Sequence, residues 1–194
     1  MINNQLSDEE KQIFAYHESG HVVFIYLLGY SCKKVYLNDE EGGMTESNTD
    51  KTEIYYFIKS NYKIFKWRLA LIGLAGHCVE QYYKNPDKKF DINTWYSFDQ
   101  GQLQINIGRK HGIENVNIFL PYYLNTYCST IIKTLEYSHI WESIERIANQ
   151  LLQKENNTLE QNEIEFYLNE SGLFNYIKSE DSRKFYEMIN SLPC

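Results

Sequence analysis

The segment HESGH at residues 17–21 lies inside a stretch whose apolar residues repeat with the period of an α-helix. The repeating residues are Ile13, Phe14, Val22, Ile25 and Leu28. Ser7 and Glu10 form the S-x-x-E pattern of a capping box at the start of this stretch, and Gly29 follows its end. The pattern therefore predicts a capped helix over about residues 8–28 that carries both histidines.

Two histidines four positions apart on a helix lie about 40° from one another around its axis, so both imidazoles can reach one ion. Zinc binds such neutral ring nitrogens and lowers the pKa of a water that it binds to near 7. Glu18 stands beside His17 and His21, where it can take a proton from that water and donate it to a leaving amine. The motif predicts a zinc peptidase centre and leaves its third ligand open.

The residues after this helix predict a small sheet and then a buried helix. A strand-like piece spans Val35 to Leu37, and the glycines and acidic residues after it indicate a loop or hairpin. Residues 69–83 are strongly apolar, which indicates a largely buried helix. Its small residues permit a neighbouring helix to come close, and these are Gly73, Ala75 and Gly76.

The second half of the chain has a helical pattern almost throughout. One helix is expected to end near Gly112, and a long helical segment to cover about residues 122–154. Thr158 is expected to cap a short helix over about residues 159–169, and a last helix to cover about residues 175–190. The pattern predicts a C-terminal helical bundle.

A chain of 194 residues suits one sizeable core, so we expect a single domain over residues 1–194. The C-terminal helices over about residues 171–190 are expected to be an appendage to it. The predicted fold class is mainly α (α+β): a helical HExxH zincin-like domain with a small inserted sheet.

Composition excludes several classes of partner. The formal net charge of -7 argues against a nucleic-acid partner, because phosphate binding needs clustered Lys and Arg. The N-terminal MINNQLSDEEKQ is polar and acidic, unlike a signal peptide, and the longest apolar run, HVVFIYLLGY, is too short to cross a bilayer. The four cysteines lie far apart, which predicts reduced structural thiols. We expect a soluble, cytoplasmic protein without membrane insertion.

Five segments, in their order along the chain, together resemble one known family. HESGH is followed by KKVYL and GGMTE (33–46), LIGLAGHCVEQYY (71–83), SFDQGQLQINIGRKHGI (97–113) and IERIANQLLQKENNTLEQNEIEFYL (144–168). The series resembles the peptidase domain of FtsH-type AAA zinc metalloproteases. In that domain the corresponding parts are, in order, the HEAGH helix, a strand and glycine loop, a glycine-rich helix, a segment with the aspartate ligand and a C-terminal stretch. The resemblance covers about residues 10–170.

The resemblance implies Asp99 as the third zinc ligand, after the two histidines of the motif, and Glu18 as the general base. Two other carboxylates stay open as the third ligand, since zinc accepts carboxylate oxygens. One is Glu80, a helical glutamate of the kind that some other zinc peptidases use, and the other is Asp91. If Glu80 is not a ligand, we expect it to be a hydrogen-bond partner of one or an exposed helix end.

FtsH-type proteases carry a membrane anchor and an ATPase module ahead of the peptidase domain. Here sixteen residues precede His17 and no GxxxxGK[ST] loop is present, so we expect a stand-alone peptidase domain that needs no ATP. The resemblance implies a zinc-dependent endopeptidase that cleaves unfolded proteins or peptides, as a homo-oligomer or docked to a separate partner. We expect the substrate to pair with an edge strand near Val35 to Leu37. The alternative is a peptidase-derived regulatory or binding module that keeps zinc and cleaves little; the intact Glu18 favours the enzyme.

Overall fold

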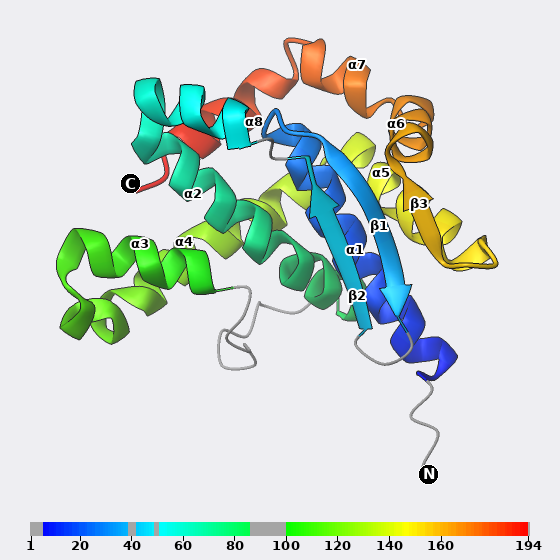
Figure 1. The fold of residues 1–194 in the computed structure, drawn as a ribbon, viewed down its shortest axis with the longest axis horizontal. Coiled ribbons are helices and arrows are strands. Elements are labelled where there is room, and N and C mark those ends of the chain that lie inside the picture. The colour runs from blue at the N-terminus through cyan, green and yellow to red at the C-terminus, as the bar shows by residue number, and fades with distance from the viewer. Residues whose placement is uncertain (1–5, 39–41, 49–50, 86–99, 194) are drawn as a thin grey trace.

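The computed structural model describes the backbone of residues 6–38, 42–48, 51–85 and 100–193, with the backbone alone over residues 51–66. The fold is mainly helical with a small antiparallel sheet, which confirms the predicted fold class. The sheet lies against helix α1, and the C-terminal helices run along one end of the molecule (Figure 1). The elements are α1 (Asp8–Leu27), β1 (Cys32–Asn38), β2 (Gly42–Ser47), α2 (Lys51–Lys84), α3 (Gly101–His111), η2 (Ile113–Asn115), α4 (Val116–Leu135), α5 (Ser138–Gln153), β3 (Thr158–Glu160), α6 (Gln161–Glu170), α7 (Leu173–Lys178) and α8 (Ser182–Asn190).

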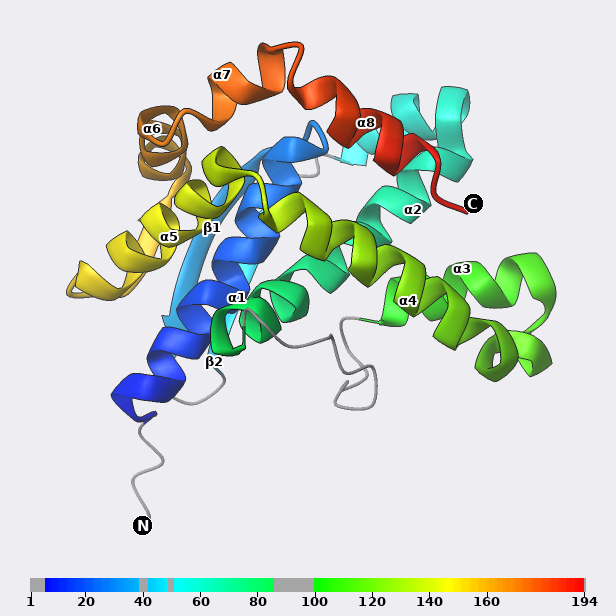
Figure 2. The ribbon, with the colours of Figure 1, turned by 180° about the vertical axis from the view of Figure 1, so that it is seen from behind.

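Helix α1 begins and ends where the sequence predicts. The hydroxyl of Ser7 accepts from the backbone N–H of Glu10, and the Glu10 carboxylate accepts from the backbone N–H of Ser7, so the capping box is present. Gly29 follows the helix with φ +85°, a conformation that favours glycine. From Ala15 onward most of the helix is buried, because the sheet covers one side and α2 and α5 cover the others. Figure 2 shows α5 lying across α1 on the side away from the sheet.

Helices α1 and α2 cross in close contact at Gly20. A Cβ at this position would lie 2.8 Å from Cγ2 of Val79 and 2.9 Å from the carbonyl oxygen of Ala75. The close approach that the small residues of α2 predict is therefore confirmed. It brings the histidine-bearing turns of α1 against α2 and sets the position of the motif in the fold.

The sheet has the strand order β2-β1-β3, so the strand over Val35 to Leu37 is central rather than an edge. The prediction of an edge strand there was wrong. Val35 pairs with Thr45 of β2 on one side and with Leu159 of β3 on the other. Val35 and Leu159 are both fully buried, and this apolar contact draws a segment from far along the chain onto β1. The edge strand beside α2 is β2 (Figure 1).

The prediction that Thr158 caps a helix was also wrong. Thr158 pairs with Tyr36 as the first residue of β3, and Asn157 turns the chain before it with φ +46°. Helix α6 begins three residues later, with Glu160 as its cap and a capping box between Glu160 and Glu163. Because Thr158 pairs as a strand residue, the chain stays extended there and the helix begins only at Gln161.

Two helical segments that the sequence predicts as continuous are each divided in the structure. The segment over 122–154 consists of α4 and α5, which break at Tyr137 (ψ 119°), because α4 packs on α2 and α5 on α1. Helix α4 also begins before Pro121, whose missing N–H falls in the second turn beside the exposed Asn117. The segment over 175–190 consists of α7 and α8, divided at the extended Ser179 (ψ 164°).

Cys32, Cys78 and Cys128 are buried free thiols, as expected for reduced structural cysteines. Burial raises the pKa of the Cys32 thiol to about 12, so this group stays neutral at physiological pH. Within the part of the chain that the structure describes, no helix has both the length and the apolar character needed to cross a membrane.

Candidate metal centre

Helix α1 brings His17, Glu18 and His21 into one cluster. One ligand atom from each residue lies within 4.8 Å of the others, and this is a group that can hold a metal ion. The Nε2 atoms of His17 and His21 are 3.1 Å apart, and the two rings meet at an interplanar angle of 73°. The helical spacing of the motif thus produces the geometry that the sequence predicts.

Both imidazoles are oriented by hydrogen bonds from their other ring nitrogen to helix α2. Nδ1 of His21 donates to the carbonyl oxygen of Ile72 at 2.7 Å, since a carbonyl can only accept. Nδ1 of His17 lies 3.1 Å from Oε2 of Glu80, and an ionised carboxylate also only accepts. With Nδ1 of each neutral ring donating to α2, the Nε2 lone pairs of both rings can be directed at one metal ion.

The spacing of these two nitrogens fits zinc. Two nitrogens at the usual Zn–N distance in a tetrahedral arrangement are about 3.3 Å apart, close to the 3.1 Å between Nε2 of His17 and Nε2 of His21. Two unprotonated lone pairs at this distance repel one another unless a cation or a proton lies between them. A cation held between the two rings would remove this repulsion.

Gly76 of α2 provides the space in which the two rings meet. A Cβ at this position would lie 2.7 Å from both Cδ2 and Nε2 of His17 and would also meet Nε2 of His21. Gly76 lies one helical turn after Ile72 and one turn before Glu80, so a single stripe of α2 forms the wall behind both histidines.

Replacing Gly76 by alanine is expected to weaken zinc binding by at least about tenfold, because the methyl group displaces both rings from their partners. Gly108→Ala is the control: it is also a glycine inside a helix, but its Cβ would make ordinary contacts, the nearest at 3.4 Å. Zinc affinity is measured by competition with a coloured chelator. Equal zinc affinity in the two variants would contradict this account of Gly76.

Glu80 lies behind His17 and not beside the two Nε2 atoms. Burial acts to raise the pKa of Glu80, but hydrogen bonds from His17 and Lys84 and the charges of these residues outweigh burial and lower the pKa to about 2. The carboxylate is thus ionised and orients the ring of His17, with Lys84 at 2.6 Å as its second partner. Asp91 and Asp99 lie outside the described residues.

Glu18 is an almost fully buried carboxylate, 5% exposed, on the sheet side of the histidine pair. The hydroxyl of Thr45 on β2 donates to its Oε2 at 2.6 Å. Gly43, two residues earlier on the same strand, lies against the side chain: a Cβ there would be 2.6 Å from Cγ of Glu18. Strand β2 therefore forms the wall that holds Glu18 in place.

A cleft of about 450 Å³ opens onto this cluster. Helices α1 and α2 and strand β2 form its walls, and Gln102 reaches it from α3. Its apolar lining comes from Phe14, Ile25, Met44 and Ile72, and Met44 is 46% exposed. The cleft is large enough to admit part of a peptide beside the three residues of the motif.

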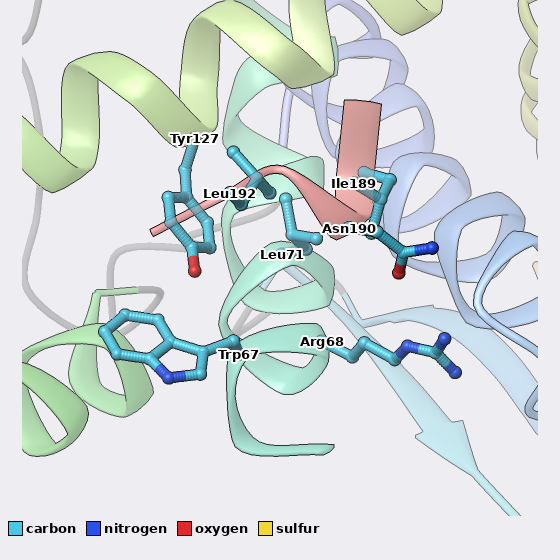
Figure 3. Close-up of a pocket in the computed structure, with 7 residues that line it drawn as sticks. All are labelled: Trp67, Arg68, Leu71, Tyr127, Ile189, Asn190 and Leu192. Atoms are coloured by element: carbon cyan, nitrogen blue, oxygen red, sulfur yellow. The ribbon is translucent and has the colours of Figure 1, made fainter. Parts of the chain in front are cut away.

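A second cavity, of about 240 Å³, lies between α2, α4 and the C-terminal residues (Figure 3). Trp67 and Tyr127 stand at one end and Arg68 and Asn190 at the other. Arg68 donates to the carbonyl oxygen of Leu28 at 3.4 Å, where a cation stabilises the C-terminal end of α1. Among the described residues that line this second cavity there is no His, Cys, Asp or Glu.

The sequence predicts His17, Glu18 and His21, and the structure brings these residues together. The sequence does not identify Thr45, Gly43 or the carbonyl of Ile72, because these groups come close to the cluster only when the chain folds. The one signal for the first two is the segment GGMTE after the predicted strand. No protein-family model matches the chain, and none of the curated proteins matches it.

Proposed function

We propose that the protein is a zinc-dependent endopeptidase that hydrolyses peptide bonds in unfolded proteins or peptides. The observation that carries the proposal is the pair of Nε2 atoms of His17 and His21, 3.1 Å apart, beside the buried carboxylate of Glu18 in the wall of a cleft. The resemblance to FtsH-type peptidase domains supports the same function.

His17 and His21 would hold the zinc ion through Nε2, with Asp99 as the third ligand that the resemblance implies. Bound zinc acts as a Lewis acid towards the attacking water and the scissile carbonyl. Ile72 and Glu80 fix the ring orientations through Nδ1, so the two ligands need little reorganisation when the metal binds.

Glu18 supplies the proton transfers. One carboxylate oxygen of this residue and one ring nitrogen of each histidine lie within 4.8 Å of one another, so the base stands close to the proposed metal and its water. The carboxylate takes a proton from that water as it attacks and then donates the proton to the nitrogen of the leaving amine. Burial of Glu18 beside Gly43 keeps the carboxylate at the cleft wall, where both steps take place.

Strand β2 is the element to which an extended substrate would bind, by adding as a further strand to the edge of the sheet. It is the sheet edge next to α2, and its residues Gly43, Met44, Thr45 and Ser47 line the cleft. A peptide that adds to this edge gains main-chain hydrogen bonds that do not depend on its sequence. Unfolded segments provide this extended backbone, whereas folded proteins do not.

Chelation of the metal is expected to abolish cleavage of an unfolded test protein such as reduced casein, and stoichiometric zinc is expected to restore it. ATP is expected to leave the rate unchanged. Cleavage is followed by mass spectrometry of the products, with heat-inactivated protein as the control. A protein that binds zinc and shows no zinc-dependent cleavage across a broad library of unfolded peptides would instead be a binding module.

A further inference from the structure

The carboxylate of Glu18 has one hydrogen-bond donor among the described residues, the hydroxyl of Thr45. The Oγ1–Oε2 distance of 2.6 Å is typical of a hydroxyl that donates to an ionised carboxylate. The same Oγ1 lies 3.3 Å from the main-chain carbonyl oxygen of Glu18, so Thr45 contacts both the side chain and the helix that carries it.

The two oxygens of Glu18 have different surroundings. Oε2 accepts from Thr45, whereas Oε1 accepts no hydrogen bond from the described part of the chain. Oε1 faces Gly43, where a Cβ would lie 3.0 Å from it. Because Gly43 has no side chain, strand β2 can lie this close to the carboxylate, and Glu18 lines the cleft.

We infer that Thr45 is a positioning residue for the general base, an inference that rests on the proposed function. Its hydroxyl fixes Oε2 of Glu18 and so selects Oε1 as the oxygen that exchanges a proton with water and the leaving amine. Without this hydroxyl the carboxylate can rotate about its terminal side-chain bonds, and fewer molecules hold the base in the reactive orientation.

The position of Thr45 is itself set by the sheet. Thr45 pairs with Val35 in the β1–β2 ladder, and Val35 is fully buried. Residues 43 and 45 point to the same face of β2, which is the face towards Glu18. The strand that receives the substrate in the proposed function therefore also holds the base, so substrate binding and base orientation depend on one element.

The test compares Thr45→Val, which removes the hydroxyl at nearly constant shape, with Thr45→Ser, which keeps it. Thr45→Val is expected to lower kcat about tenfold to a hundredfold with little change in KM or zinc content, because misplacing a catalytic group by about 1 Å has effects of this size. Thr45→Ser is expected to recover most of the lost rate. Thr126→Val, on α4 and away from the cleft, controls for the loss of a threonine hydroxyl that bonds a helix carbonyl.

Crystal structures of the zinc-loaded variants give a second readout that does not require activity. In Thr45→Val the Glu18 carboxylate is expected to occupy a new or a second orientation while both histidine rings stay in place. Thr45→Ala replaces it if the valine variant does not fold. The inference is overturned if the variants without the hydroxyl keep the wild-type kcat, if serine does not recover the rate, or if Glu18 stays unmoved. A wild-type protein that cleaves nothing defeats the proposed function instead, and the position of Glu18 still tests the hydrogen bond.

Discussion

Replacing Glu18 by glutamine is expected to lower the rate of peptide cleavage by at least about a hundredfold and to leave metal content nearly unchanged. Glutamine cannot take a proton from the attacking water, and a general base contributes about 10²–10⁴-fold to such a reaction. The fold is retained because the Thr45 hydroxyl can donate to the amide oxygen of glutamine as it does to Oε2 of Glu18. The expected result is therefore a folded, zinc-loaded and nearly inactive protein.

The measurement pairs kcat on an unfolded protein or long peptide with zinc content and the thermal unfolding midpoint. Glu9→Gln is the matched control, since it makes the same chemical change at an exposed position of the same helix. It should retain wild-type activity. If Glu18→Gln cleaves as fast as the wild type, the activity belongs to a contaminant or to other residues, and the proposed mechanism fails.

Replacing both His17 and His21 by alanine is expected to remove the metal. We expect one zinc per wild-type chain purified without added metal, and almost none in the double variant, because a single carboxylate ligand binds zinc weakly. The variant should also lose the stabilisation that zinc gives to the native state, which appears as a lower thermal midpoint in the presence of zinc. Elemental analysis and thermal unfolding with and without zinc measure these two effects.

His111→Ala and His139→Ala serve as controls for the double variant, since they remove histidines that lie outside the cluster. Full zinc occupancy in the double variant would overturn the assignment of the site.

Single replacements of the three candidate carboxylates then identify the third ligand. Asp99→Ala is expected to weaken zinc binding most and Asp91→Ala least. Glu80→Gln should fall between them, by about ten- to a hundredfold, because Glu80 orients His17 through Nδ1 and does not reach its Nε2. An unchanged zinc affinity in Asp99→Ala together with loss of zinc in Glu80→Gln would make the glutamate the ligand.

The parts of the fold that the sequence predicts well are those with local signals. The capping box at Ser7, the apolar period that follows it and the glycine at position 29 define α1 almost to the residue. Strand β3 has no such signal, since three residues are too few to show alternation and Leu159 becomes part of a strand only by packing opposite Val35. The break at Tyr137 is likewise determined by which helix each half packs against.

The same difference between local signals and long-range packing applies to the candidate site. His17, Glu18 and His21 form one turn of one helix, so their proximity follows from sequence spacing alone. Thr45 meets Glu18 from 27 positions away, and the carbonyl of Ile72 meets His21 from 51 positions away. Contacts over such separations depend on how α1, α2 and the sheet pack, and no periodicity within the sequence encodes them.

The two histidine rings differ in what a mutation can do to them. The partner of His21 is the main-chain carbonyl of Ile72, which every amino acid would supply as long as α2 stays helical. The partner of His17 is the side chain of Glu80, and a change in one codon removes it. Replacing Ile72 should therefore leave the orientation of the His21 ring unchanged, whereas replacing Glu80 should change the orientation of the His17 ring. A saturation screen of α2 would reveal this asymmetry as one permissive and one restrictive site, two helical turns apart.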